Sequence, residues 1–208
     1  MRPVHIEHFL LALAWIPALC PAQEVQAYAL ALDRKIAAYA LWDGSRTASC
    51  SVEYGAPSWH ADHAAAIPKL RGRRVRFGKD TWAHLEVDTP ITLGGVAVAP
   101  GAYCLALDCA EDGTWSLVLL NSAVLRRRGL PGFATQRVLG LGTRYPMAHT
   151  ESAPLAHQFT VAFEGVGPSP ADAQLRIAFG PHVLTAAVRF DPREMIAIDL
   201  PPQPTGGR

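Results

Sequence analysis

The sequence predicts a mainly β protein: an antiparallel β-sandwich or barrel-like domain with an N-terminal helix and one or two short helices. From Ser49 to Leu120, short segments alternate apolar and polar residues and are separated by turn residues. Within this range, Gly94-Gly95 fits the two-residue turn of a β-hairpin, which needs positive φ at both positions. The sequence shows no repeating strand–helix units, which would indicate a parallel sheet.

Residues 1–22 have the pattern of a signal peptide. Arg2 precedes an apolar run from Phe9 to Leu19, and small residues at Cys20 and Ala22 suit a signal-peptidase site. We therefore expect cleavage after Ala22 and a periplasmic or secreted mature protein. The apolar run is shorter than the roughly 20 residues that cross a bilayer. No later segment is longer and equally apolar, so we expect no transmembrane segment in the mature chain.

Residues 23–48 are predicted to form an N-terminal helix and its connection to the β domain. Apolar residues recur there at steps of three and four, which places them on one side of a helix. They are Val25, Tyr28, Leu32, Ile36 and Tyr39. Asp43-Gly44 follows Trp42 and ends the predicted helix. We expect this helix to pack against the main domain.

The β-sandwich domain is expected to span residues 49–192. Its predicted strands are Ser49–Tyr54, Val75–Phe77, Trp82–Asp88, the two strands around Gly94-Gly95, Ala102–Cys109, Trp115–Leu120, His157–Glu164, Gln174–Phe179 and His182–Phe190. Short helices are predicted at Ser58–Ile67 and Ser122–Arg128, each with its first serine as the N-cap. Gly140–Pro154 is expected to be an irregular crossing loop, and residues 193–208 a tail rich in Pro and Gly.

The charge of the chain argues against nucleic acid as a partner. The chain has 19 Lys and Arg residues, 18 Asp and Glu residues and a net charge of +1. Loss of residues 1–22 would remove one basic and one acidic residue, so the balance would not change. A domain that binds nucleic acid usually carries a clear basic excess. The short arginine runs at 71–76 and 126–128 are interpreted as solvated faces rather than sites for an anionic glycan or headgroup.

Three cysteines follow the predicted cleavage site: Cys50, Cys104 and Cys109. Cys104 and Cys109 lie on one predicted strand, about 17 Å apart, whereas a disulfide requires Cα atoms within about 7 Å. Cys50 and Cys109 both alternate toward the inside of their strands. The sequence therefore allows two alternatives: a Cys50–Cys109 disulfide formed in an oxidising compartment, or three buried unpaired thiols.

Several motifs follow the predicted strands in a specific order. They are Val52-Glu53-Tyr54-Gly55-Ala56-Pro57, Gly72-Arg73-Arg74, Phe77-Gly78-Lys79-Asp80-Thr81-Trp82, Gly94-Gly95, Pro100-Gly101-Ala102-Tyr103, Trp115-Ser116-Leu117 and Phe179-Gly180-Pro181-His182. In this order they resemble the DUF2911 family of secreted bacterial proteins, over about Ser49 to Phe190. The resemblance implies a mostly β, exported domain. It implies no particular activity, cofactor or catalytic residue.

The densest group of metal-ligating side chains is Trp59-His60-Ala61-Asp62-His63. On a helix, His60 and His63 would face the same side and could bind one divalent metal ion. His84, on a nearby predicted strand, would be the third ligand, and Glu86 the general base of a metal-dependent hydrolase. The alternative is a structural role for His63, which shares a helical stripe with Trp59 and Ile67.

A second candidate site is the polar face of the strand Trp82–Asp88, where Trp82, His84 and Glu86 alternate outward. An aromatic ring with polar neighbours suits a carbohydrate or peptide. The sequence contains no Gly-x-Ser-x-Gly elbow and no Ser-x-x-Lys motif. We therefore predict a non-enzymatic binding or interaction module for a small ligand, glycan or envelope protein, with a metal-dependent hydrolase and a purely structural envelope component as alternatives.

Overall fold

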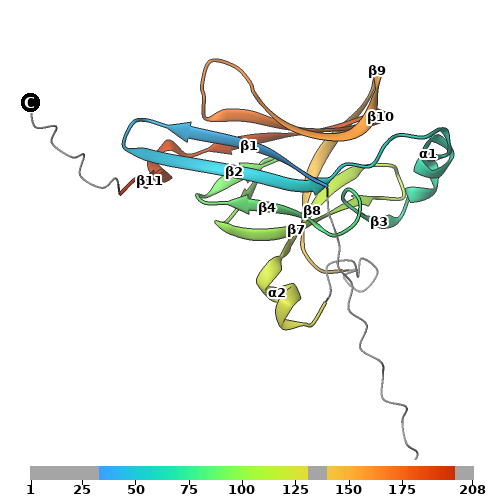
Figure 1. The fold of residues 1–208 in the computed structure, drawn as a ribbon, viewed down its shortest axis with the longest axis horizontal. Helices are drawn as coiled ribbons and strands as arrows, with labels where there is room; N and C mark the ends of the chain where they lie inside the picture. Colours follow the sequence, from blue (N-terminus) through green and yellow to red (C-terminus); the bar gives the residue numbers. More distant parts are fainter. Residues whose placement is uncertain (1–32, 131–139, 200–208) are drawn as a thin grey trace, which may run out of the picture. The chain divides into compact units, whose positions relative to one another are not determined.

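The computed structural model describes residues 33–130 and 140–199, and there it confirms the mainly β, antiparallel fold (Figure 1). The strands are β1 (Arg34–Trp42), β2 (Arg46–Gly55), β3 (Arg73–Arg76), β4 (Ala83–Val87), β5 (Ile91–Leu93), β6 (Val96–Val98), β7 (Gly101–Cys109), β8 (Trp115–Asn121), β9 (Thr143–Gly165), β10 (Asp172–Phe190) and β11 (Ile196–Ala197). The helices are α1 (Ala61–Ala66), α2 (Ser122–Arg127) and the 3-10 helices η1 (Ile67–Leu70) and η3 (Pro192–Glu194). None of these helices has the length and apolar character needed to cross a membrane.

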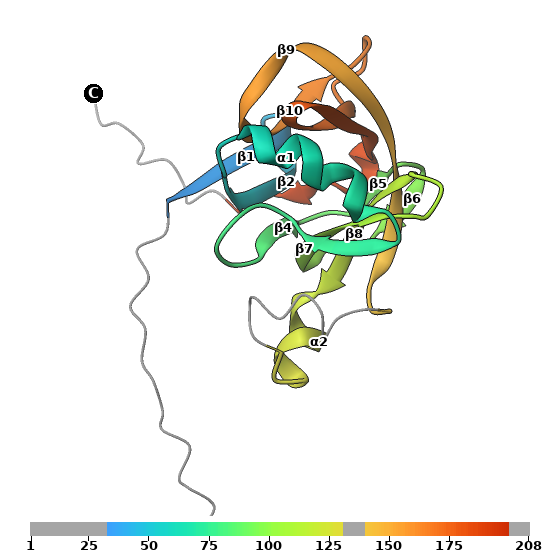
Figure 2. The ribbon, with the colours of Figure 1, turned by 90° about the vertical axis from the view of Figure 1, so that its right-hand side faces the viewer.

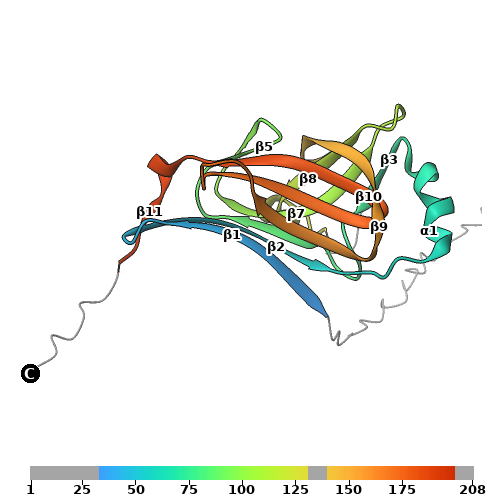
Figure 3. The same cartoon turned by 90° about the horizontal axis from the view of Figure 1, so that it is seen from above.

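The strands form two layers of one continuous sheet. The first layer has the order β1-β2-β4-β7-β8, with β3 beside β7 and β11 beside β2, and the second has the order β9-β10-β5-β6. The long strand β9 pairs with β8 through residues 143–147 and with β10 through residues 148–165, so it passes from one layer to the other. Figures 2 and 3 show α1 lying across one end of the strands.

The main core lies between the two layers. Alternation along β7 and β8 turns every second residue toward it, as in any pleated strand. These residues are Leu105, Leu107, Leu117 and Leu119, and they share one buried cluster with Val161, Leu175, Ile177 and Val188 of the second layer. The opposite face of β7 and β8 is buried as well, in a smaller cluster made of Trp82, Cys104, Ala106, Val118, Leu120 and Leu125. Both faces of these two strands are therefore covered.

The predicted hairpin is confirmed by β5 and β6. Ile91–Leu93 pairs antiparallel with Val96–Val98, and the turn between them is Gly94-Gly95. The φ angles of Gly94 and Gly95 are 57° and 82°. Both lie in the left-handed region, where glycine has no steric penalty and where a primed turn requires its two central residues.

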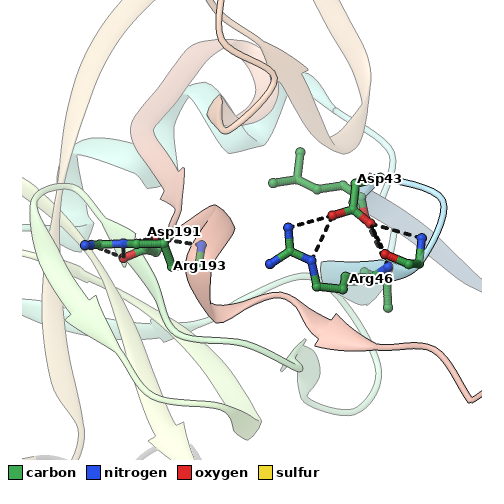
Figure 4. A network of polar contacts seen from close by, with 7 residues as sticks. Asp43, Arg46, Asp191 and Arg193 are labelled. Carbon is green, nitrogen blue, oxygen red and sulfur yellow. Dashed lines mark hydrogen bonds and ion pairs between the residues drawn. The ribbon is translucent and has the colours of Figure 1, made fainter.

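The turn between β1 and β2 is held by Asp43. Its carboxylate accepts hydrogen bonds from the backbone N–H groups of Ser45 (3.0 Å) and Arg46 (2.7 Å) and from Nε of Arg46 (2.8 Å; Figure 4). The backbone hydrogen bond from Ser45, followed by that from the Arg46 side chain, lowers the pKa of Asp43 to about 2. The Asp191 carboxylate accepts comparable bonds from Arg193 just before β11 (Figure 4).

The predicted N-terminal helix is wrong where the structure describes it. Residues 34–42 form β1, which pairs with β2 along its whole length, from Arg34 opposite Gly55 to Trp42 opposite Thr47. Almost every residue from Ile36 to Trp42 is apolar, so this segment satisfies the helical and the strand period equally, and pairing with β2 decides between them. The rest of that expected helix, residues 23–32, and the predicted signal peptide lie outside the described residues.

The region after residue 140 is more regular than predicted. Most of the expected loop Gly140–Pro154 belongs to β9, and the two expected strands after Gln174 are one strand, β10. Residues 196–197 of the expected tail pair with β2 as β11. The helix caps also differ, because α2 is capped by the side chain of Asn121 instead of Ser122, and α1 begins after His60 instead of Ser58.

The structure excludes a disulfide between Cys50 and Cys109, since Cys50, Cys104 and Cys109 are all free and buried. Cys50 lies opposite Val87, and Val87 lies opposite Gly101 at the start of β7. Cys109 lies at the other end of β7, eight residues further on and thus about 26 Å away along the strand. Both thiols are buried, but they lie at opposite ends of the sheet.

Candidate functional site

The connection between β2 and α1 is fixed by hydrogen bonds to β9. The N–H of Trp59 donates to the carbonyl of His157 (2.8 Å), and the N–H of Phe159 donates to the carbonyl of Pro57 (2.9 Å). These bonds form where the pairing of β9 with β10 shifts register around Gly180. The irregular stretch of β9 thus gains partners from the segment before α1, and this holds α1 over the end of the strands.

The ring of Trp59 anchors the start of α1. It packs against Phe179 of β10 with ring centroids 4.9 Å apart and against His63 of α1 at 5.4 Å. His63 in turn caps the helix, because its Nδ1 accepts a hydrogen bond from the backbone N–H of His60 (2.9 Å). The three-residue spacing of the two histidines therefore has a structural explanation: it closes the first turn of α1.

A pocket of about 280 Å³ lies between α1, η1 and the end of the two layers, and we call it the α1 pocket. Its lining is mostly apolar and comes from β3, β7, β8, β9 and β10 as well as from the helices. The lining residues are Pro57, His63, Ala66, Ile67, Leu70, Val75, Arg76, Gly78, Leu107, Trp115, His149, Phe159, Ile177, Phe179, His182 and Leu184. The pocket thus combines aliphatic and aromatic walls with three imidazoles and one guanidinium.

The polar part of the lining is dominated by a pair of histidines from neighbouring strands. Nε2 of His149 in β9 lies 3.1 Å from Nδ1 of His182 in β10, and the two rings are stacked with centroids 5.3 Å apart. Burial, followed by the nearby His149 ring, lowers the pKa of His182. Glu151 acts in the opposite direction, with its Oε1 4.0 Å from Nδ1 of His182. The imidazole of His182 is therefore neutral at neutral pH.

The structure does not bring His84 together with His60 and His63. His84 lies opposite Cys104 of β7, whereas His63 lines the pocket beside Leu107 of the same strand. Residues 104 and 107 point to opposite faces of a strand, so the two imidazoles lie on opposite sides of the first layer. Within residues 33–130 and 140–199, no group of three His, Cys, Asp or Glu side chains is arranged to hold a metal ion. The hydrolase alternative thus gains no support from the geometry.

His84 has its own surroundings on the outer side of the sheet. Its Nδ1 lies 3.8 Å from the thiol of Cys104, which also lies 3.5 Å from the hydroxyl of Ser122. Burial lowers the pKa of His84 and raises that of Cys104. Both groups are consequently held in their neutral forms, which disfavours a thiolate–imidazolium pair for nucleophilic chemistry.

The predicted Trp82, His84 and Glu86 platform is not an exposed aromatic surface. Trp82 is only 2% exposed and packs in the cluster beneath α2, while His84 is half-buried and Glu86 is exposed. The carbonyl of Trp82 accepts a hydrogen bond from Arg34 (2.8 Å). Trp82 is therefore a core residue of the smaller cluster, and the ring that was expected to meet a ligand is covered by the protein itself.

A second cavity, of about 360 Å³, lies on the outer side of β3, β7 and β8, and charged and polar residues make up much of its lining. At its base, Asp108 receives two hydrogen bonds from Arg74 (2.5 and 2.8 Å) and one from Arg144 (2.7 Å). Arg74 also donates to the carbonyl of Leu141 (2.6 Å). Arg74, Asp108 and Arg144 of this cavity are thus engaged with one another.

No family model, no curated protein and no solved structure matches this chain.

Proposed function

We propose that this chain is a non-enzymatic binding protein for a small, largely apolar ligand that occupies the α1 pocket. The observation that carries the proposal is the lining of that pocket, in which mostly aliphatic and aromatic side chains surround a few polar groups, among them the paired His149 and His182. Pockets for small molecules usually combine a mostly apolar wall with a few fixed polar groups that orient the ligand.

The size and shape of the lining favour a compact ligand with one or two rings or a short acyl chain. A volume of about 280 Å³ lies just below the usual range of such pockets, which is about 300–1,000 Å³. The rings of Trp115, Phe159 and Phe179 offer flat apolar surfaces from three different strands. Among the partners expected from the sequence, these features support a small molecule over a glycan or an envelope protein.

We also propose that the mature protein is exported and that it belongs to the DUF2911 family. The pattern of residues 1–22 supports export, and the order of motifs between Ser49 and Phe190 supports the family. N-terminal sequencing of the protein recovered from the periplasm or medium tests the first point. A mature N-terminus at Gln23 is expected, and an intact Met1 would contradict export by cleavage.

The ligand proposal is tested with a neutral fluorescent probe, N-phenyl-1-naphthylamine. We expect saturable binding with one probe per chain and amide shift changes in NMR spectra confined to α1, η1 and the adjoining ends of β9 and β10. Absence of saturable binding would overturn the proposal. So would shift changes that map to the outer face of β7 and β8, around Trp82.

A further inference from the structure

We propose that the ligand of the α1 pocket is an apolar acid, and that its carboxylate binds to the His149–His182 pair after the pair has taken up one proton. This inference rests on the proposed function, because it assumes that the α1 pocket is where a ligand binds. It adds the chemical class of that ligand and a dependence of its affinity on pH.

The two histidines of the pair share a hydrogen bond that fixes where their protons lie. Nε2 of His149 and Nδ1 of His182 are 3.1 Å apart, so in the neutral state one of these atoms donates and the other accepts. Of the two nitrogens outside this hydrogen bond, Nδ1 of His149 and Nε2 of His182, one is then an acceptor and the other a donor; we call them the outward nitrogens. One added proton makes both outward nitrogens N–H donors and gives the pair a charge of +1. The protonated pair is thus a receptor for a carboxylate.

The surroundings supply no carboxylate within the lining of the pocket itself. Glu151 of β9 lies directly opposite His182 but does not line the pocket, and its side chain is 71% exposed. The other titratable groups that line the pocket are His63 of α1 and Arg76 of β3. The guanidinium of Arg76 donates to the carbonyl of Asp80 and keeps its positive charge at the pocket. Within the described residues, the titratable groups that line the pocket are therefore neutral or positive, and Glu151 beside His182 is the one nearby anion that would compete with a carboxylate ligand.

Two indole rings contact the pair. The ring of Trp59 contacts His182 with centroids 6.0 Å apart, and the ring of Trp115 contacts His149 at 6.3 Å. His149 is exposed but His182 is half-buried, and since charge-assisted hydrogen bonds are stronger in a partly desolvated site, an anion bound at His182 gains more than it would at a fully exposed histidine. The same burial lowers the pKa of His182 in the empty protein, so binding of the anion is coupled to proton uptake.

The experiment compares two compounds of the same shape, 2-naphthoate and 2-naphthamide, by displacement of N-phenyl-1-naphthylamine at pH 5.5 and pH 8.0. The carboxylate is ionised at both values. We expect 2-naphthoate to bind about tenfold more tightly at pH 5.5, the size of effect given by one charge-assisted hydrogen bond. The affinities of 2-naphthamide and of the neutral probe should change little between the two values.

Variants assign the effect to the pair. In His149→Gln/His182→Gln, glutamine keeps polar side chains at both positions but cannot be protonated, so the pH dependence for 2-naphthoate should disappear while 2-naphthamide still binds. The matched control is His157→Gln, an exposed histidine of β9 outside the pocket lining, which should retain the pH dependence. Glu151→Gln removes a competing anion and should strengthen 2-naphthoate binding.

The outcomes separate this inference from the proposed function. If both naphthalene compounds bind with equal affinity at both pH values, the pocket binds ligands but the acid-binding role of the histidine pair is wrong. A pH dependence that survives in His149→Gln/His182→Gln has the same consequence. If neither compound nor the neutral probe binds, the proposed function itself fails.

Discussion

The indole ring of Trp59 lies directly on the backbone of Gly180. A Cβ atom at residue 180 would come within 2.5 Å of three ring atoms of Trp59, a distance that real side chains do not reach. Gly180 also has a φ angle of 60°, in the left-handed region. This contact joins the start of α1 to the middle of β10, and it therefore sets the position of one wall of the α1 pocket.

Gly180→Ala should destabilise the fold and weaken binding of N-phenyl-1-naphthylamine. The positive φ angle alone costs about 1–2 kcal/mol for a residue with a Cβ atom, and displacement of the indole adds about 1–3 kcal/mol. Gly167→Ala is the matched control, since Gly167 has a φ angle of 78° but nothing within 4 Å of the added Cβ. Urea unfolding should give the larger loss for Gly180→Ala, and equal losses for the two variants would show that the indole contact is unimportant.

Trp82→Ala should lower the free energy of unfolding but leave the α1 pocket functional. Loss of a buried tryptophan usually costs about 3–5 kcal/mol, and Trp82 is only 2% exposed. Trp42→Ala is the control, because Trp42 is 73% exposed and its loss should change stability by less than about 0.5 kcal/mol. Unfolding monitored by circular dichroism measures the difference. A stable Trp82→Ala protein that no longer binds ligand would restore Trp82 as a recognition residue.

Local sequence features predict part of this fold, and contacts between distant segments determine the rest. The hairpin at Gly94-Gly95 and the strands β4, β7 and β8 were predictable, because their turn residues and alternation are local properties. The strand β1 was not predictable, because a segment that is apolar at nearly every position fits both the helical and the strand period. Its pairing with β2 determines that it is a strand. Alternation predicts that Trp82, His84 and Glu86 share one face of their strand. It does not predict that α2, which follows later in the chain, covers Trp82 on that face.

The candidate site depends on a longer-range effect. His149 and His182 are far apart in sequence and meet only because β9 pairs with β10. Between Ala178 and His182 that pairing shifts register twice, so an ideal hairpin would not place these two side chains side by side. The three-residue spacing of His60 and His63 was visible in the sequence. A helix cap and a pair of metal ligands both require this spacing, so the sequence does not distinguish the two roles.

Asp108→Asn should destabilise the protein at neutral pH but much less at acidic pH. Burial by itself would raise the pKa of Asp108, but hydrogen bonds from Arg74 and Arg144 outweigh burial and lower it. A lowered folded-state pKa stabilises the fold above the unfolded-state value of about 3.9, and this contribution is lost as the pH falls through the folded-state pKa. At pH 7 we expect a loss of about 3 kcal/mol, because the side chain of Arg74 is 3% exposed and would keep an uncompensated charge.

The control for Asp108 is Asp172→Asn. Asp172 pairs with Arg189, whose side chain is 71% exposed, and such surface pairs contribute less than about 1 kcal/mol. Urea unfolding between pH 7 and pH 2 should show that the difference between wild type and Asp108→Asn shrinks once the pH falls below about 3.9. A difference that is constant over this range would mean that the charge of Asp108 has no part in its effect.

Cys50 should be the least reactive of the three described thiols in the native protein. Burial, with a smaller effect of Asp88, raises the pKa of Cys50 to about 12, so almost no thiolate is present at pH 8. Alkylation with iodoacetamide, followed by peptide mass spectrometry, should label Cys50 slowly in the folded state and rapidly in urea. Fast labelling of folded protein, or a peptide that links Cys50 to Cys109, would contradict the structure.

Ala66→Phe should fill the α1 pocket and block ligand binding without unfolding the protein. Ala66 is an exposed residue of α1 that lines the pocket, so a benzyl group there competes with a ligand for the same apolar walls. Ala64→Phe is the matched control, since Ala64 is exposed on the same helix but does not line the pocket. Both changes carry the same helix-propensity cost of about 0.5 kcal/mol. Displacement titrations should show lost affinity for N-phenyl-1-naphthylamine in Ala66→Phe alone, and retained affinity would mean that the probe binds elsewhere.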